Sequence, residues 1–154
     1  MSSKIKQITA HLFQGALAHV ASEGIPDAVD LVFLMAQEAE RIALPVGKRM
    51  TFVYLPIADD PTGCSGALFE KLRSWARSAY GHNVLTICHM GENRSGLMSA
   101  LILYEVAGYT GNSAVTTVQQ YGPINSSHAP HALWNPGFVK QIRELDDAGT
   151  DEAN

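Results

Sequence analysis

Continuous apolar runs of strand length recur along the chain, and the stretches between them carry apolar residues at helical spacing. The runs lie at 30–35, 50–57 and 83–87. Runs of this length that are rich in β-branched and aromatic residues are typical of strands buried in a sheet. The residues from Lys6 to Gly15 form a further run, which predicts one opening strand. The strands at 30–35 and 50–57 are expected to be fully buried.

The segments between these runs predict helices. Residues 16–24 hold a short helix that Gly24 ends. A longer helix ends at Gly81 and has one apolar face, formed by Leu68, Leu72, Trp75 and Ala79. The stretch 96–106 is almost entirely apolar, which predicts a helix buried in the middle of the protein.

Two further helices are expected toward the C-terminus. Asn112 is a suitable N-cap for the first of them, which covers 112–122. The second has the clearest start, with Asn135 as N-cap and Pro136 in the first helical position. The tail at 148–154 is expected to be disordered.

Strands that alternate with helices predict an α/β domain with a central sheet. The chain has 154 residues, of which 46 % are hydrophobic and 17 % charged, an ordinary balance for one globular domain. We expect that domain to cover residues 1–147. In such folds, ligands bind where strands end and helices begin.

The composition of the chain argues against two classes of binding partner, nucleic acid and membrane. The net charge of −4 and the lack of Lys/Arg runs argue against nucleic acid. The N-terminus lacks the features of a signal peptide, and no apolar stretch reaches membrane-spanning length. We therefore expect a cytoplasmic protein with no membrane partner, whose oligomeric state the sequence does not indicate. Cys64 and Cys88 are expected to be thiols, and neither a metal nor a cofactor is expected.

The segment 88–95, CHMGENRS, has a predicted strand before it and a predicted helix after it. The backbone N–H groups of such a loop, together with those of the helix start, form an anion-binding site. The planar guanidinium of Arg94 matches two oxygens of a phosphate. The helix N-terminus and Arg94 favour the thiolate form of Cys88, which is an activated nucleophile.

Two more groups complete this candidate chemistry. Ser95 is placed to donate its hydroxyl to the thiolate and so to stabilise sulfur as a leaving group. Displacing an alkoxide or phenoxide from phosphorus also needs a general acid. Asp59 and Asp60 follow the strand at 50–57, whose carboxyl end would share a sheet edge with Cys88 in a parallel arrangement. The residues alone leave open which of the two is the acid.

The spacing of Cys88, Arg94 and Ser95 resembles the signature of the cysteine-based protein tyrosine and dual-specificity phosphatases. The segments ITAHLFQGA, VYLPIADD and NPGFVKQI are similar to the opening strand, the general-acid segment and the C-terminal helix of that family. The small size of the chain resembles the compact dual-specificity branch.

The resemblance implies a central mixed, mostly parallel sheet flanked by helices, with the phosphate-binding loop between a strand and a buried helix. It implies that Asp59, rather than Asp60, is the general acid. The implied activity is hydrolysis of phosphotyrosine and phosphoserine/threonine monoesters in phosphorylated proteins through a cysteinyl-phosphate intermediate. The implied substrate-binding residues are His89, Met90, Gly91, Glu92, Asn93 and Arg94.

The sequence departs from the family pattern at two positions. Ile87 stands where the family usually has His, and His89 either compensates for that change or is an ordinary loop residue. Glu92 places a carboxylate inside the anion-binding loop, and we expect it to point outward and to pair with a basic side chain.

Several alternatives stay open. Residues 91–96, GENRSG, also resemble the loop of cysteine-based RNA 5′-triphosphatases, and inositol or sugar phosphates would suit the same chemistry. A phosphate-binding module without catalysis is a further alternative. A disulfide between Cys64 and Cys88 is less favoured, as is a pocket mouth lined by His128, His131 and Trp134.

Overall fold

The computed structural model describes residues 5–36, 50–90, 92–121 and 131–152, with side chains up to 147. The sheet has the strand order β1-β2-β5-β3-β4. Its first pair is antiparallel, and β2–β5, β5–β3 and β3–β4 are parallel. This is the mixed, mostly parallel sheet that the resemblance implied.

The N-terminal run forms two strands and not the single strand predicted. β1 (Lys6–Thr9) and β2 (Leu12–Ala16) pair as a hairpin. The intervening Ala10 and His11 are not strong turn-forming residues, so the apolar pattern alone does not show the reversal. The consequence is that β2, and not β1, lies beside β5 in the sheet.

The strands at the centre of the sheet are more buried than the strand at its edge. Every residue of β3 (Leu31–Ala36) and of β5 (Val84–Cys88) is buried. β4 (Thr51–Ile57) has buried side chains only at Leu55 and Ile57, so the expectation of a fully buried strand is wrong there. Among the described strands β4 is at the edge of the sheet, with β3 as its neighbour, and its outer residues are more exposed.

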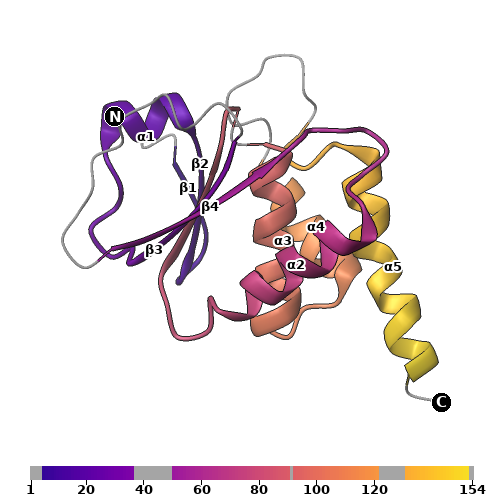
Figure 1. Cartoon of the computed structure of the whole chain (residues 1–154). Coiled ribbons are helices and arrows are strands. Elements are labelled where there is room, and N and C mark those ends of the chain that lie inside the picture. Colours follow the sequence, from indigo (N-terminus) through magenta and orange to yellow (C-terminus); the bar gives the residue numbers. More distant parts are fainter. Residues whose placement is uncertain (1–4, 37–49, 91, 122–130, 153–154) are drawn as a thin grey trace.

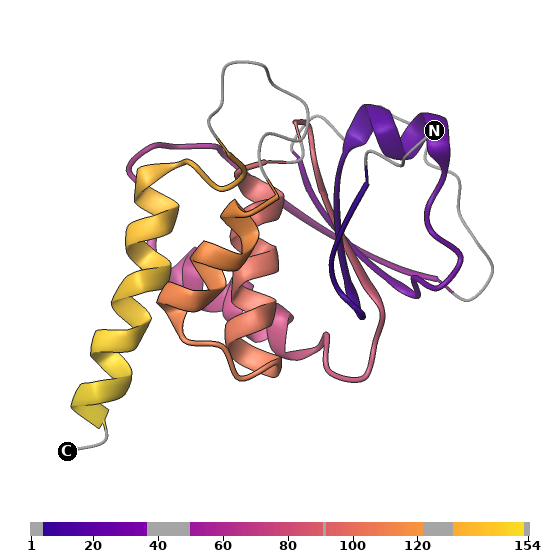
Figure 2. The same ribbon diagram turned by 180° about the vertical axis from the view of Figure 1, so that it is seen from behind.

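The helices α2 (Gly66–Arg77), α3 (Arg94–Val106), α4 (Gly111–Gln119) and α5 (Pro136–Glu152) gather on one face of the sheet. The short α1 (Leu17–Glu23) lies on the other side, as the view from behind also shows (Figures 1 and 2). In this group α3 packs against the sheet and against α2, α4 and α5.

The burial of α3 explains its nearly uniform apolar sequence. Its residues from Ser95 to Leu103 are all buried. Gly96 lets the first turn approach the segment before α5, because a Cβ there would lie 3.1 Å from the Leu133 Cβ. The start of the helix is therefore held between the sheet and a distant part of the chain.

Two details of the last helices differ from the sequence prediction. Thr110, and not Asn112, caps α4: its hydroxyl accepts a hydrogen bond from Ser113 N over 3.0 Å. The Asn112 side chain instead accepts from Arg143 Nε on α5. Both residue types are good caps, and packing against α5 selects between them.

The start of α5 is as predicted, with the Asn135 Oδ1 accepting from the backbone N–H groups of Gly137 and Phe138. Its end is not, because the helical backbone continues to Glu152, into the segment 148–154 that was expected to be disordered. Extending an existing helix by further turns is far easier than starting one. None of the described helices is long and apolar enough to cross a membrane.

Candidate active site

The candidate catalytic groups meet at one edge of the sheet. β4 and β5 both run parallel to β3, so their carboxyl ends, at Ile57 and Cys88, lie at the same edge. The loop with Asp59 leaves the first strand, and the loop with Asn93 leaves the second (Figure 1). Ligands bind at such an edge in open α/β sheets.

Cys88 is the last residue of β5 and Ser95 is in the first turn of α3. The Cys88 Sγ and the Ser95 Oγ are hydrogen-bonded at 3.2 Å, and both residues are buried. Ser95 therefore directs its hydroxyl to the sulfur and not to a backbone cap. Ile87, where the family usually has His, is fully buried and offers the sulfur no hydrogen bond.

Arg94 starts α3 and connects the loop to the end of β4. Its Nη1 donates to the Ile57 carbonyl over 3.4 Å. This contact places the guanidinium next to the end of β4, where the loop that contains Asp59 begins. The arginine thus lies between the two loops that the sequence predicted to face each other.

Asp59 is held by side-chain amides from two other parts of the chain. Asn93 Nδ2 donates to its Oδ2 over 3.1 Å, and Asn135 Nδ2 donates to its Oδ1 over 2.7 Å. Asn135 N also donates to the Asn93 Oδ1 over 2.8 Å, which joins the two amides. The network ties together the loop that follows β4 (residues 58–65, the candidate acid loop), the segment between β5 and α3, and α5.

Asp60 has a different environment. Its Oδ1 accepts hydrogen bonds from Thr62 N over 2.8 Å and from Thr62 Oγ1 over 2.7 Å. These bonds lower the pKa of Asp60. They also hold its carboxylate against the backbone of the same turn. Of the two carboxylates, Asp59 is the one bonded to Asn93, between Cys88 and α3.

The role of Asn135 in this network was missed by the sequence reasoning, which gave the residue only a capping role. The side chain does both, because its Oδ1 caps α5 while its Nδ2 reaches Asp59 and the Asp60 carbonyl. When the side-chain oxygen of asparagine caps a helix, its NH2 group remains available as a donor, which serine and aspartate lack. The choice of asparagine at this cap is therefore the sequence feature that indicates a second contact.

α5 also holds the far end of the acid loop. Gln141 Oε1 accepts from Cys64 N over 3.0 Å, and its Nε2 donates to the Cys64 carbonyl over 2.7 Å. Gly137 packs so closely on this loop that a Cβ there would lie 2.6 Å from the Pro61 carbonyl oxygen and would collide with Gly63 N. The loop is thereby fixed against the helix along its length.

Cys64 is a half-buried thiol in this contact. Burial raises its pKa, although its thiol also donates to the Gln141 Oε1. Cys64 and Cys88 are both free thiols, so the less favoured disulfide between them is not present.

Glu92 does not point outward, so that expectation is wrong. Its residue exposure is 3 %, and its backbone carbonyl accepts from Leu133 N over 3.2 Å and from Gln14 Nε2 over 3.5 Å. These bonds come from β2 and from the segment before α5, which enclose the loop. Burial first, and the charge of Asp59 second, raise the pKa of Glu92.

The other proposed contacts are distributed around the loop. His89 is exposed and Met90 partly exposed, while Gly91 lies outside the described residues. His128 also lies outside them. His131 is hydrogen-bonded to the Ala132 carbonyl, and Trp134 is 45 % exposed next to the buried Asn135.

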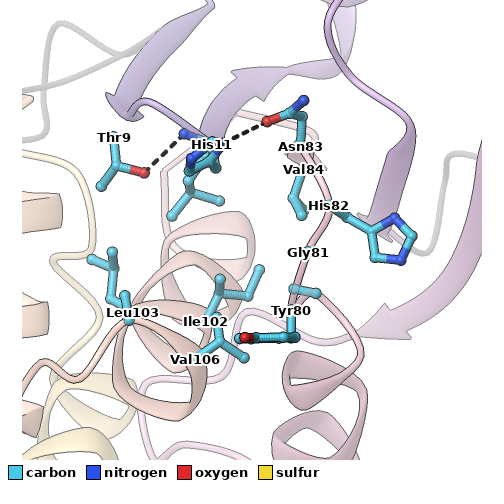
Figure 3. Close-up of a pocket in the computed structure, with 13 residues that line it drawn as sticks. Thr9, His11, Tyr80, Gly81, His82, Asn83, Val84, Ile102, Leu103 and Val106 are labelled. Atoms are coloured by element: carbon cyan, nitrogen blue, oxygen red, sulfur yellow. Dashed lines mark hydrogen bonds between the residues drawn. The ribbon is translucent and has the colours of Figure 1, made fainter.

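A cavity of about 540 Å³ lies at the opposite end of the same elements. It is bounded by the start of β5 at Val84 and the end of α3 at Val106 (Figure 3). Across its upper side His11 is hydrogen-bonded to Asn83 at 2.7 Å. None of the candidate catalytic residues lines this cavity, and the described residues contain no cluster of potential metal ligands.

Comparisons with known proteins agree with this architecture. No protein-family model matches the chain, and no curated protein does. A mouse protein described as a dual specificity phosphatase, solved with zinc tungstate, has a TM-score of 0.75 at 17 % identity, over 99 % of this chain and 92 % of its own.

Two human structures are similarly close. DUSP28 has a TM-score of 0.71 at 18 % identity, with 97 % of both chains covered. The tyrosine phosphatase-like serine/threonine/tyrosine-interacting protein has a TM-score of 0.69 at 20 % identity, over 97 % of this chain and 99 % of its own. The sheet order, the buried α3 and these superpositions together show that the chain has the fold of the compact dual-specificity phosphatases.

Proposed function

We propose that the protein is a cysteine-dependent phosphatase that hydrolyses phosphotyrosine and/or phosphoserine/threonine monoesters in proteins. One observation carries the proposal. The Cys88 sulfur is hydrogen-bonded to the hydroxyl of Ser95, which lies in the first turn of a buried helix. The Asn93 side-chain amide, which precedes that helix, donates to Asp59. A nucleophile, its supporting hydroxyl and an acid thus share one site.

The loop would hold the phosphate before reaction. In this proposal the free backbone N–H groups at the N-terminus of α3 supply donors and a positive dipole end. The Arg94 guanidinium adds a bidentate contact to two oxygens. These donors stabilise the equatorial oxygens, over which the charge of the transition state is spread.

In the first step the Cys88 thiolate attacks phosphorus in line with the leaving oxygen. A sulfur–phosphorus bond forms as the phosphorus–oxygen bond breaks, and Asp59 transfers its proton to the departing alkoxide or phenoxide. The products of this step are the free alcohol and a cysteinyl-phosphate.

In the second step water attacks the cysteinyl-phosphate. Asp59, now ionised, takes a proton from that water, and the sulfur–phosphorus bond breaks to release inorganic phosphate. The Ser95 hydroxyl donates to the departing thiolate and stabilises its charge.

A phosphate-binding module without turnover is the second candidate, because one structural neighbour is itself described as tyrosine phosphatase-like. The phosphoprotein partner and the cytoplasmic location stay predictions.

The decisive experiment is hydrolysis of an aryl phosphate against pH, without added metal and with a reductant. Wild type, Cys88→Ser, Asp59→Asn and Asp60→Asn are compared. We expect a bell-shaped profile that disappears in Cys88→Ser, loses its basic limb in Asp59→Asn and is unchanged in the matched control Asp60→Asn. Substantial turnover by Cys88→Ser would refute the mechanism, and an inactive wild type that binds phosphate would favour the binding module.

The substrate class needs a second panel. Phosphopeptides with phosphotyrosine, phosphoserine or phosphothreonine are compared with 5′-triphosphorylated RNA and with inositol and sugar phosphates. A higher kcat/KM for the phosphopeptides supports a protein phosphatase. A higher value for RNA or for the small phosphoesters would assign the same chemistry to a non-protein substrate.

A further inference from the structure

Glu92 lies inside the loop that runs from Cys88 to Arg94, yet the reaction above uses no carboxyl there. Its exposure is 3 %, and the bonds from Leu133 N and Gln14 Nε2 hold its backbone carbonyl from two sides. At this exposure the carboxyl does not extend into solvent.

The Glu92 carboxyl is also poorly solvated. Among residues 5–36, 50–90, 92–121 and 131–147, its buried Oε2 has no hydrogen-bond partner. An ionised carboxylate without partners is much more expensive to bury than a neutral acid. Burial, and then the like charge of Asp59, raise the pKa of Glu92 accordingly.

The groups that other elements present to Glu92 carry no positive charge. β2 presents the neutral Gln14, and the segment before α5 presents the N–H of Leu133. The acid loop presents Asp59, which carries the same charge. On the phosphate-binding loop itself, Arg94 donates to the Ile57 carbonyl.

We propose that Glu92 couples anion binding to a proton, so that the loop takes up a phosphate dianion together with one proton on the Glu92 carboxyl. The inference rests on the proposed function only in that the loop 88–94 binds phosphate. A dianion bound by the loop adds to the like charge of Asp59, which already acts on Glu92, and like charges in one site repel. Protonation removes this repulsion and costs little in a site that already disfavours the ion.

The coupling is reciprocal. Binding of the dianion raises the proton affinity of Glu92 by the same factor by which protonation of Glu92 raises the anion affinity. Below the pKa of Glu92 the acid is neutral and the loop binds best. As the pH rises through that pKa the carboxyl ionises, and the affinity for the anion falls.

The test is calorimetric titration of sulfate into the intact protein between pH 5.5 and 8. Sulfate keeps two charges over this range, so its own protonation does not contribute. Repeating each titration in two buffers of different ionisation enthalpy gives the number of protons taken up. Wild type is compared with Glu92→Gln and with Asp60→Asn, a control whose carboxyl is bonded to Thr62.

Wild type and Asp60→Asn are expected to take up more protons than Glu92→Gln and to lose about tenfold more affinity toward pH 8. Glu92→Met, which removes the carboxyl without leaving a buried amide, is expected to behave as Glu92→Gln does. Equal proton uptake and equal pH dependence in wild type and both Glu92 variants would overturn the inference and leave the proposed function intact. Absence of sulfate binding in wild type would overturn both.

Discussion

The Asn93 side-chain amide donates a hydrogen bond to Asp59 across 3.1 Å, and so joins the proposed phosphate-binding loop directly to the candidate general acid. The acid is thus positioned by groups outside its own loop, since Asn135 binds its other oxygen. A carboxyl held at both oxygens has one orientation, which is what proton transfer to a leaving group requires.

Replacing Asn135 by Ser separates its two roles. Serine still caps α5 but cannot reach Asp59 or the Asp60 carbonyl, so the free energy of unfolding should fall by about 1–3 kcal/mol for the two lost hydrogen bonds while α5 stays folded. We expect kcat to fall about tenfold for phosphate esters with poor leaving groups, because these depend on the acid. Kinetics over a series of aryl phosphates measure this, and an equal loss for good and poor leaving groups would contradict it.

Ser95→Ala removes the hydroxyl that lies 3.2 Å from the Cys88 sulfur. A hydrogen bond to a charged group contributes about 1.5–3 kcal/mol, so the second step should slow by about 10–100-fold. Rapid-mixing kinetics should then show a burst of released phenol followed by slow turnover.

Ser99→Ala is the matched control for Ser95→Ala. Ser99 is also a buried serine of α3, but its hydroxyl is bonded to Thr86 Oγ1 at 2.8 Å. Its loss should lower stability by about 1 kcal/mol and leave the burst kinetics of wild type unchanged. A burst in this control would show that the effect comes from the helix and not from the Ser95 hydroxyl.

Gly137→Ala should displace the acid loop, because the new Cβ would lie 2.6 Å from the Pro61 carbonyl oxygen. Overpacking of this kind costs about 1–3 kcal/mol, which exceeds the gain in helix propensity. Thermal unfolding and kcat should both report the loss. Gly66→Ala, where a Cβ has open space at the start of α2, should leave both unchanged or raise stability slightly.

Glu92→Gln should stabilise the protein at neutral pH and have little effect near pH 4. The folded-state pKa of Glu92 is raised above its ordinary value, so the folded state binds more protons than the unfolded chain between the two pKa values. Wild-type stability contributed by this group therefore falls as the pH rises through that window. Denaturant unfolding at pH 4 and pH 7.5 should show a gain in the free energy of unfolding at the higher pH that is much smaller at the lower pH.

The sequence was sufficient for the features that depend on local pattern. The Cys88–Arg94 spacing between a strand and a helix, the buried α3 and the Asn135 cap are all visible in the order of residues. It was insufficient where the tertiary environment decides. A glutamate in a loop is usually exposed, and only the enclosure by β2 and the segment before α5 buries Glu92.

The sequence also does not decide between two neighbouring residues that suit the same structural role. Thr110 and Asn112 both suit an N-cap, and their roles follow from the packing of α4 against α5. The residues between β1 and β2 include no strong turn former, so the sequence predicts one long strand where the structure has a hairpin. These differences leave the position of Cys88 at the sheet edge unchanged.

The attachment of the acid loop to α5 has a consequence for inhibitor design. The Gln141 side chain is hydrogen-bonded to the backbone N–H and carbonyl of Cys64 at one end of this loop. At the other end the Asn135 side chain donates to Asp59 and to the Asp60 carbonyl. A loop so fastened has its conformational entropy removed before any ligand arrives. Small rigid phosphate mimics that contact this loop should therefore bind without having to order it.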